Sequence, residues 1–430
     1  MNTVKILVPV LVLAGLLMIA ACSSPAVTGI KVHIQNGEYQ DAIHLADSVI
    51  AGAEAENPEV WYWRGRAYSF MMDWEGSAES FKTAYELDPS YASSIINYWP
   101  SFYNAAANYV EADRIDEAVA MLETGMEIVP ERPEFDQMLG QIALNAGEKQ
   151  VALEHFLKSV DLAEVRIATL QERYAAETDP VLQEQIGEQL DRNISTVVLS
   201  SYNAGAILKN FYFATEDEAE KAALVEQAIA VFNRGIEADP SNADLMTGLA
   251  EIYILEEMYS EALAIYDNAL IAIDQSLEDG WISPEDATAM RANVLLTRGF
   301  TFIEMERYDE GIQALEECRV TLGDTYQVLA MIGHANFVME NYDESLDIMT
   351  QLTQMDGLTA EEYANAWYMM YANYIRLERD NDALQAIQAA IQYDGDNADY
   401  YEFLAQTYST LGRNAQAMEA MEKAQSLRNQ

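Results

Sequence analysis

Cysteine and histidine, two residue types that often perform catalysis or bind metals, are rare in this 430-residue sequence. The two cysteines, Cys22 and Cys318, are almost 300 residues apart, and a pair of closely spaced thiolates, the usual anchor of a zinc site, is missing. No two histidines have the spacing of metal ligands; the four are His33, His44, His155 and His334. We therefore expect no metal site, no cofactor and no intrachain disulfide.

The carboxylates are many, but none forms a recognisable acid–base pair. Asp394, Asp396 and Asp399 invite comparison with a calcium loop. A ligand is missing at Ala398, and the distal glutamate of an EF-hand is absent, so a turn is the better interpretation. The sequence also contains no glycine-rich phosphate loop and no serine nucleophile elbow. These observations predict a protein that is not an enzyme.

The charge of the chain restricts its partners. Asp and Glu number 71 against 24 Lys and Arg, which gives a formal net charge of −47. Nucleic acid is excluded as an expected partner because phosphate binding needs a basic surface. Basic partners fit better, since an acidic surface attracts them during diffusional encounter.

The N-terminus contains an uncharged, mostly apolar run that ends in LLMIAACSS, Leu16 to Ser24. A positive start, an apolar core and small residues at its end are typical of a secretory signal peptide. Ile19-Ala20-Ala21-Cys22 resembles the lipobox of bacterial lipoproteins, which implies cleavage after residue 21 and lipid attachment at Cys22. In that family, Ser23 rather than aspartate after the cysteine implies an outer-membrane lipoprotein facing the periplasm. An uncut N-terminal helical anchor is the alternative.

A repeat with a period near 34 residues covers most of the chain after Gly29. Similar loops recur as YELDPS (85–90), EADPSNAD (237–244) and YDGDNAD (393–399). In the unit 58–89, Trp61, Gly65 and Tyr68 share one helical face, and small and aromatic residues alternate on the next helix. This pattern resembles the tetratricopeptide repeat. The resemblance implies an all-α, right-handed superhelical solenoid of about nine to ten helix-turn-helix units, in which stacking neighbours bury the apolar faces.

Departures from the period predict how the chain is divided. We expect a signal peptide (1–21), a lipidated tether (22–29), an N-terminal repeat array (30–162), an elongated helical hairpin insertion (163–219), and a C-terminal array with a capping helix (220–430). Near residues 275–286 we expect a longer loop and a capped helix start at Ser283. Tyr371 stands where the family has a small residue, which predicts a splayed helix pair there.

The repeat register also predicts which side chains contact a partner. The resemblance implies a concave groove lined by first helices, and aromatic residues and arginine dominate binding hot spots. Packing between repeats is the alternative explanation for the aromatic members. Cys318 occupies a small-residue position and is expected to be a buried, inert thiol. The candidate partner-binding residues are Tyr62, Arg66, Phe70, Tyr103, Phe300, His334, Phe337 and Tyr368.

Two functions are compatible with this pattern. The first is a non-enzymatic scaffold, anchored by lipid in the bacterial envelope, that binds protein or peptide partners in the groove of the repeats. The second is a periplasmic small-molecule carrier lipoprotein that cooperates with a transporter, its cavity lined by some of the 19 methionines and the clustered aromatic residues.

Overall fold

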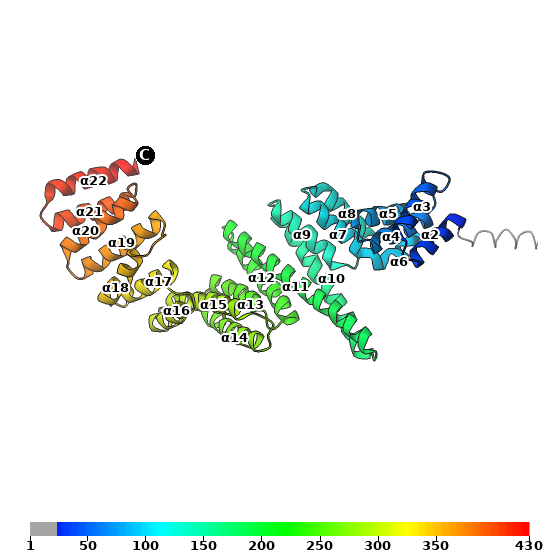
Figure 1. The fold of residues 1–430 in the computed structure, drawn as a ribbon. Helices are drawn as coiled ribbons and strands as arrows, with labels where there is room; N and C mark the ends of the chain where they lie inside the picture. Colours follow the sequence, from blue (N-terminus) through cyan, green and yellow to red (C-terminus); the bar gives the residue numbers. More distant parts are fainter. Residues whose placement is uncertain (1–23, 430) are drawn as a thin grey trace, which may run out of the picture. The chain divides into compact units, whose positions relative to one another are not determined.

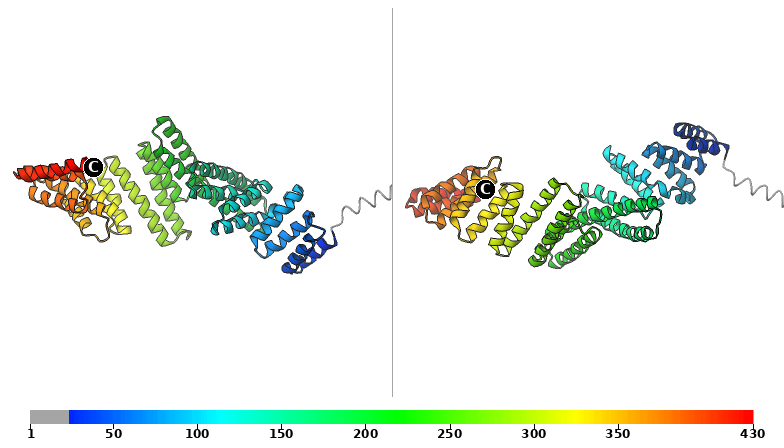
Figure 2. Two further views of the ribbon diagram at one scale, coloured as in Figure 1. Left: turned by 90° about the horizontal axis from the view of Figure 1, so that it is seen from above. Right: turned by 60° about the horizontal axis from the view of Figure 1, so that its bottom comes forward.

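The computed structural model describes residues 24–429, which contain helices and no strand. The chain divides into two compact units, one ending at Ile207 and the other beginning at Leu208. Each unit is built mainly from antiparallel helix pairs, as Figures 1 and 2 show. The prediction of an all-α fold of stacked helix-turn-helix units is confirmed.

The N-terminal unit contains four helix pairs and part of a further helix. Short helical turns, Pro89–Tyr91, α6 (Ala92–Ile95) and Ile96–Tyr98, connect the second pair to the third. The four pairs are α2 (Pro25–Gln35) with α3 (Tyr39–Ile50), α4 (Pro58–Phe70) with α5 (Trp74–Leu87), α7 (Trp99–Glu111) with α8 (Ile115–Ile128), and α9 (Pro133–Asn145) with α10 (Lys149–Ala176).

Two long helices form an antiparallel arm in this unit. The helix α10 continues to Ala176, and after a three-residue turn α11 (Pro180–Ala214) returns along it. The Ser200 hydroxyl donates to the Ser159 hydroxyl at 3.2 Å, and the Gln183 amide donates to the Tyr174 carbonyl at 3.4 Å. The ends near the turn extend beyond α7–α9 (Figure 1) and are largely exposed. The expected start of the hairpin insertion, residue 163, lies in the middle of α10. The second helix of the fourth pair and the first helix of the arm are therefore one continuous helix.

The C-terminal unit begins within α11 and continues with α12 (Glu218–Ala238). Its five helix pairs are α13 (Ala243–Leu255) with α14 (Tyr259–Glu278), α15 (Pro284–Glu304) with α16 (Tyr308–Leu322), α17 (Tyr326–Val338) with α18 (Tyr342–Thr353), α19 (Ala360–Arg376) with α20 (Asp380–Tyr393), and α21 (Ala398–Thr410) with α22 (Asn414–Arg428).

The turn inside each pair contains a residue with positive φ. This left-handed conformation ends the first helix and reverses the chain in a few residues. Glycine adopts it without strain, whereas other L-residues disfavour it by about 1–2 kcal/mol. The nine positions are Gly37, Met72, Asp113, Gly147, Glu257, Glu306, Glu340, Glu378 and Gly412.

Buried hydrogen bonds join neighbouring repeats in the N-terminal unit. The Ser77 hydroxyl of α5 donates to the Gly65 carbonyl of α4 at 2.9 Å and lies 2.8 Å from the Ser101 hydroxyl of α7. Both serine side chains are buried. Because Gly65 has no side chain, the Phe81 ring packs directly on its backbone; a Cβ atom there would lie 2.8 Å from the ring.

The same arrangement recurs in the C-terminal unit. The Ser345 hydroxyl of α18 donates to the Gly333 carbonyl of α17 at 2.8 Å. The buried Asn373 amide of α19 donates to the Ser345 hydroxyl at 3.0 Å. In both units these contacts give partners to the buried serine hydroxyls and, in the C-terminal unit, to the Asn373 N–H groups.

Candidate functional site

The first candidate site surrounds Arg66 on α4. Its guanidinium carbon lies 4.3 Å from the ring centre of Trp63, 5.9 Å from Tyr62, 6.0 Å from Phe70 and 5.7 Å from Tyr98. Arginine is attracted to the negative faces of aromatic rings at such distances. Tyr62, Arg66 and Phe70 lie close together because they are spaced four residues apart on one face of α4. With Trp63 and Tyr98 they are called the Arg66 group below.

Arg66 differs from its neighbour Arg64 in its polar contacts. Arg64 donates to the Asp47 carboxylate at 2.7 Å and to the Ser80 hydroxyl at 2.8 Å. Within residues 24–429, Arg66 forms no ion pair with a carboxylate, and its buried Nε has no hydrogen-bond acceptor. Although the chain has 71 acidic residues, the Arg66 guanidinium is therefore attracted mainly to aromatic rings.

Tyr62 and Phe70 differ in accessibility. The Tyr62 ring is partly buried against Tyr91, Tyr98 and Phe81, with ring centres 5.6, 6.4 and 5.9 Å away. This burial, together with the nearby Tyr98, raises the pKa of Tyr62, and Arg66 opposes the shift. Phe70 stacks on Tyr39 yet remains 48% exposed. Phe70 is therefore the member of this group most available to a partner.

Tyr103 on α7 belongs to a different neighbourhood. Its ring centre lies 6.1 Å from that of Trp99, and Trp99 lies under the Arg132 guanidinium at 4.4 Å. Burial, and secondarily the charge of Glu134, raises the pKa of Tyr103. Tyr103 thus lies beside the N-terminus of α9, apart from the Arg66 group.

The remaining candidates lie in the C-terminal unit. Phe300 on α15 is 42% exposed, and His334 on α17 is exposed. Phe337 is partly buried with its ring edge against Tyr342. Tyr368 on α19 stacks on Tyr400 and Phe403 of the next repeat, at 5.6 and 5.4 Å. The contacts of Tyr368 are those of packing between repeats, whereas Phe300 and His334 face solvent.

A cleft in the C-terminal unit was not among the predicted sites. It has a volume of about 540 Å³ and lies between the α12–α13 loop and the end of α14. Ile271 and Trp281 line it and are 64% and 71% exposed. An exposed tryptophan beside an apolar cleft is a common feature of interaction surfaces. Trp281 lies in the segment 275–286, which falls outside the repeat period, so no repeat register predicts where its side chain points.

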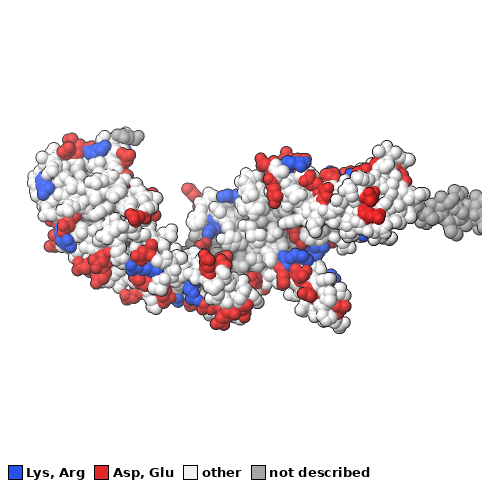
Figure 3. All heavy atoms as spheres, in the orientation of Figure 1, with Lys and Arg blue, Asp and Glu red and all other residues white. Residues whose placement is uncertain are grey.

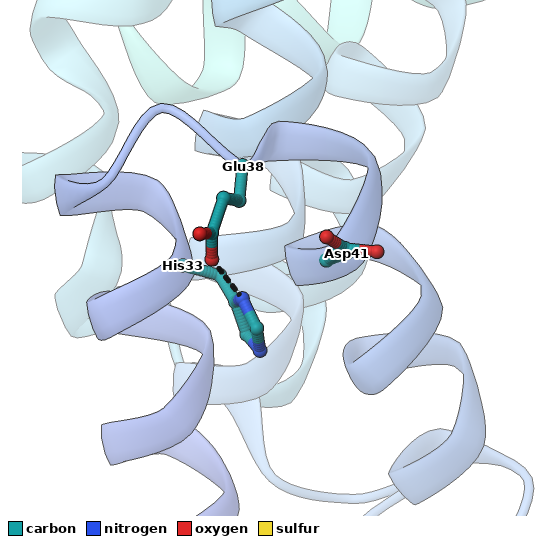
Figure 4. A group of neighbouring side chains, drawn as sticks. All are labelled: His33, Glu38 and Asp41. Carbon is teal, nitrogen blue, oxygen red and sulfur yellow. Dashed lines mark hydrogen bonds and ion pairs between the residues drawn. The ribbon is translucent and has the colours of Figure 1, made fainter.

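One group of potential metal ligands occurs near the start of the described chain. His33, Glu38 and Asp41 offer ligand atoms within 4.8 Å of one another. Figure 4 shows the His33 imidazole bonded to Glu38 across the α2–α3 turn, with Nδ1 2.7 Å from Oε2, while Asp41 stands to one side. None of the three is buried. A cation bound at this exposed position would have water as most of its ligands. The geometry therefore indicates a surface hydrogen bond between His33 and Glu38 rather than a metal site.

Cys318 is fully buried, as predicted, and burial raises the pKa of its thiol. Its Sγ donates to the Ala292 carbonyl at 3.3 Å. A raised pKa disfavours the thiolate, the reactive form of cysteine. Cys22 lies outside the described residues. Among the helices that are described, none combines the length and apolarity needed to cross a bilayer.

Comparison with known protein families gives three matches, all to the tetratricopeptide repeat. They cover residues 29–92, 224–280 and 398–430. The comparison with curated proteins gives no match.

Several solved structures resemble the chain. MamA (41–end) from Desulfovibrio magneticus RS-1 is 15% identical, with a TM-score of 0.36 over 44% of this chain and 95% of MamA. YrrB, a tetratricopeptide-repeat protein with an unusual peptide-binding site, is 20% identical, with a TM-score of 0.33 over 46% of this chain and 87% of YrrB. A chain of the APC/C hetero-tetramer Cut9–Hcn1 is 12% identical, with a TM-score of 0.34 over 95% of both chains. The repeated helix pairs and the three family matches, which lie in both units, therefore support the tetratricopeptide-repeat family for this chain.

Proposed function

We propose that the protein is a non-enzymatic scaffold that binds protein or peptide partners and is held by lipid at the bacterial outer membrane, facing the periplasm. Repeats of this family serve as protein-interaction modules, which supports the general function. The N-terminal stretch around Cys22 supports the location. A basic segment is the expected form of the partner, because the net charge is −47.

The observation that carries the binding function is the Arg66 group. A guanidinium among four rings, with exposed Phe70 beside it, offers stacking and cation–π contacts on one surface. Aromatic and arginine side chains supply most of the binding energy of interfaces. At short range, the Arg66 guanidinium favours a partner that places an aromatic or carbonyl group against it. At long range, the acidic surface of the protein attracts basic partners.

Replacing Arg66 by glutamine is expected to reduce partner capture about tenfold, the effect of losing one arginine hot spot. The photo-cross-linker p-benzoylphenylalanine in place of Phe70 would report capture by the full-length protein in the cells that produce it. Arg64→Gln is the matched control, since the same change on the same helix removes an internal ion pair instead. Mass spectrometry would identify the cross-linked partner.

Equal loss of cross-linking in Arg64→Gln and Arg66→Gln would contradict this site, because it would point to a general effect on α4. The carrier function would replace the scaffold if no protein were cross-linked and native mass spectrometry showed a small molecule retained by the purified chain. The cleft beside Trp281 is where such a molecule would first be sought.

Replacing Cys22 by alanine is expected to release the protein from the membrane fraction. Two or three acyl chains anchor stably, since each buried methylene contributes about 0.8 kcal/mol. Partition into the detergent phase of Triton X-114 would measure the change, with Cys318→Ala as the control for a buried thiol. Continued detergent partition of Cys22→Ala would favour an uncut helical anchor.

A further inference from the structure

Three arginines converge where the α10–α11 arm joins the rest of the N-terminal unit. Arg132 directly precedes α9, Arg166 lies on α10 and Arg192 lies on α11. Figure 3 shows blue atoms gathered at the root of the arm, on a surface that is otherwise mostly red and white. Burial lowers the pKa of Arg132 to about 10, and the charges of Arg166 and Arg192 add to this effect. The three residues are called the arm-root cluster below.

The arm-root cluster has little internal compensation. Arg132 has one ion pair, to Glu134 at 3.8 Å, which is longer than the 2.7 Å pair of Arg64 with Asp47. In the described part of the chain, neither Arg166 nor Arg192 forms an ion pair with a carboxylate. The buried Nε atoms of Arg132 and Arg166 have no acceptor. A buried N–H group without an acceptor costs about 1–3 kcal/mol, and more for a charged group. Leaving these two N–H groups without an acceptor is therefore unfavourable in the isolated chain.

Space for a ligand adjoins the cluster. A pocket of about 240 Å³ lies along α10 and is lined by Val165, Arg166, Thr169, Leu170, Arg173 and, from the loop before α9, Glu131. The Trp99 ring centre lies 4.4 Å from the Arg132 guanidinium carbon. Planar guanidinium groups bind carboxylates through two parallel hydrogen bonds. Apolar side chains and unsatisfied cationic donors are thus next to one another.

We propose that the arm-root cluster binds the carboxylates of an acidic peptide segment carried by a partner protein. This site shares no residue with the Arg66 group, and it extends the proposed function by giving the scaffold a second set of contacts with opposite charge selectivity. An extended polyanion such as nucleic acid fits poorly, because acidic groups, Glu131 and Glu134 among them, flank the cluster. A short segment with a few carboxylates can reach the three arginines alone.

Ionic strength distinguishes this local site from the general field of the protein. At about 0.15 M salt the Debye length is about 8 Å, so repulsion from distant carboxylates is screened. Contacts at hydrogen-bond distance to the partly buried Arg132 and Arg166 are screened much less. Binding of an acidic peptide is therefore expected to persist at this salt concentration.

The test uses the full chain and a fluorescein-labelled hexaglutamate peptide, with fluorescence anisotropy at about 0.15 M salt. Arg166→Gln combined with Arg192→Gln is expected to weaken binding at least tenfold, and it retains the partly buried Arg132. Arg114→Gln combined with Lys149→Gln is the matched control, since it removes the same charge from exposed positions of the same unit. Circular dichroism would verify the fold of both double variants.

Three results would overturn the proposal. The first is no binding of hexaglutamate to the parent protein, and the second is an equal loss in both double variants. The third is a single-stranded oligonucleotide that binds more tightly than hexaglutamate and depends on the same arginines. Cross-linking from position 70 reports the Arg66 group independently. Failure of hexaglutamate binding with intact cross-linking would therefore reject this inference and leave the proposed function in place.

Discussion

Replacing Phe81 by alanine is expected to lower the free energy of unfolding of the N-terminal repeats by about 3–5 kcal/mol. The ring is fully buried, packs directly on the backbone of Gly65, and lies 4.9 Å from the Tyr98 ring, centre to centre. Removing it leaves a cavity where two helices are closest. The neighbouring helices cannot close that cavity without moving Tyr62 as well, because the Tyr62 ring rests on Phe81.

Hydrogen exchange with mass spectrometry would measure this loss locally. Faster exchange is expected in α4 and α5, while α19 and α20 of the other unit serve as the internal reference. Phe70→Ala is the control, because Phe70 is 48% exposed and its loss should cost about 1 kcal/mol. Similar protection of α4 and α5 in the parent protein and in Phe81→Ala would show that this contact contributes little.

The second large effect is expected at Asp136, a carboxylate buried in the first turn of α9. His155 Nδ1 lies 2.9 Å from Oδ1, and Lys158 Nζ lies 3.1 Å from Oδ2, an ion pair outside hydrogen-bond geometry. Changing His155 to leucine and Lys158 to methionine would leave this charge uncompensated. Such a loss costs about 3–5 kcal/mol, and the helix N-terminus, which favours a negative charge, should keep it near the lower limit.

A third substitution separates charge from packing. Adding Asp136→Leu to the double variant removes the uncompensated carboxylate, so most of the lost stability should return. Urea unfolding followed by circular dichroism would compare the parent, the double and the triple variants. A triple variant as unstable as the double variant would mean that His155 and Lys158 act by packing alone.

The fold was largely predictable, because local patterns determine local elements. Small and large residues recur at helical spacing, which predicts helix pairs, and the cap at Ser283 is confirmed, since its hydroxyl accepts from the Asp286 N–H at 3.1 Å. The expected longer loop before it is wrong. The helix α14 continues to Glu278 because Ile273 and Ser276 extend its buried face.

The prediction of a splayed helix pair at Tyr371 is also wrong. The helices α19 and α20 pack closely, and the buried Tyr371 ring lies 5.6 Å from Phe403 of α21, centre to centre. The bulky ring is accommodated by the following repeat. A repeat register identifies the position of a residue on its helix but not which neighbouring helix its side chain contacts.

The candidate sites were only partly predictable for the same reason. Tyr62, Arg66 and Phe70 share one helix, so their spacing predicts their proximity. Arg132, Arg166 and Arg192 come from three segments, and no spacing relates them. Their convergence depends on the length of the arm, which sets the residues of α11 that lie beside α10.

The buried contacts of Ser77 and Ser345 bear on how such an array can grow or shrink during evolution. Ser77 connects α4, α5 and α7, and Ser345 connects α17, α18 and α19. Excision of α4 and α5 would remove the hydrogen-bond partner of Ser101, and excision of α17 and α18 would remove one of the two acceptors of the Asn373 amide. The repeats at these two junctions are therefore not freely exchangeable modules. A viable duplication or deletion would have to include both residues of each hydrogen-bonded pair, Ser77 with Ser101 or Ser345 with Asn373.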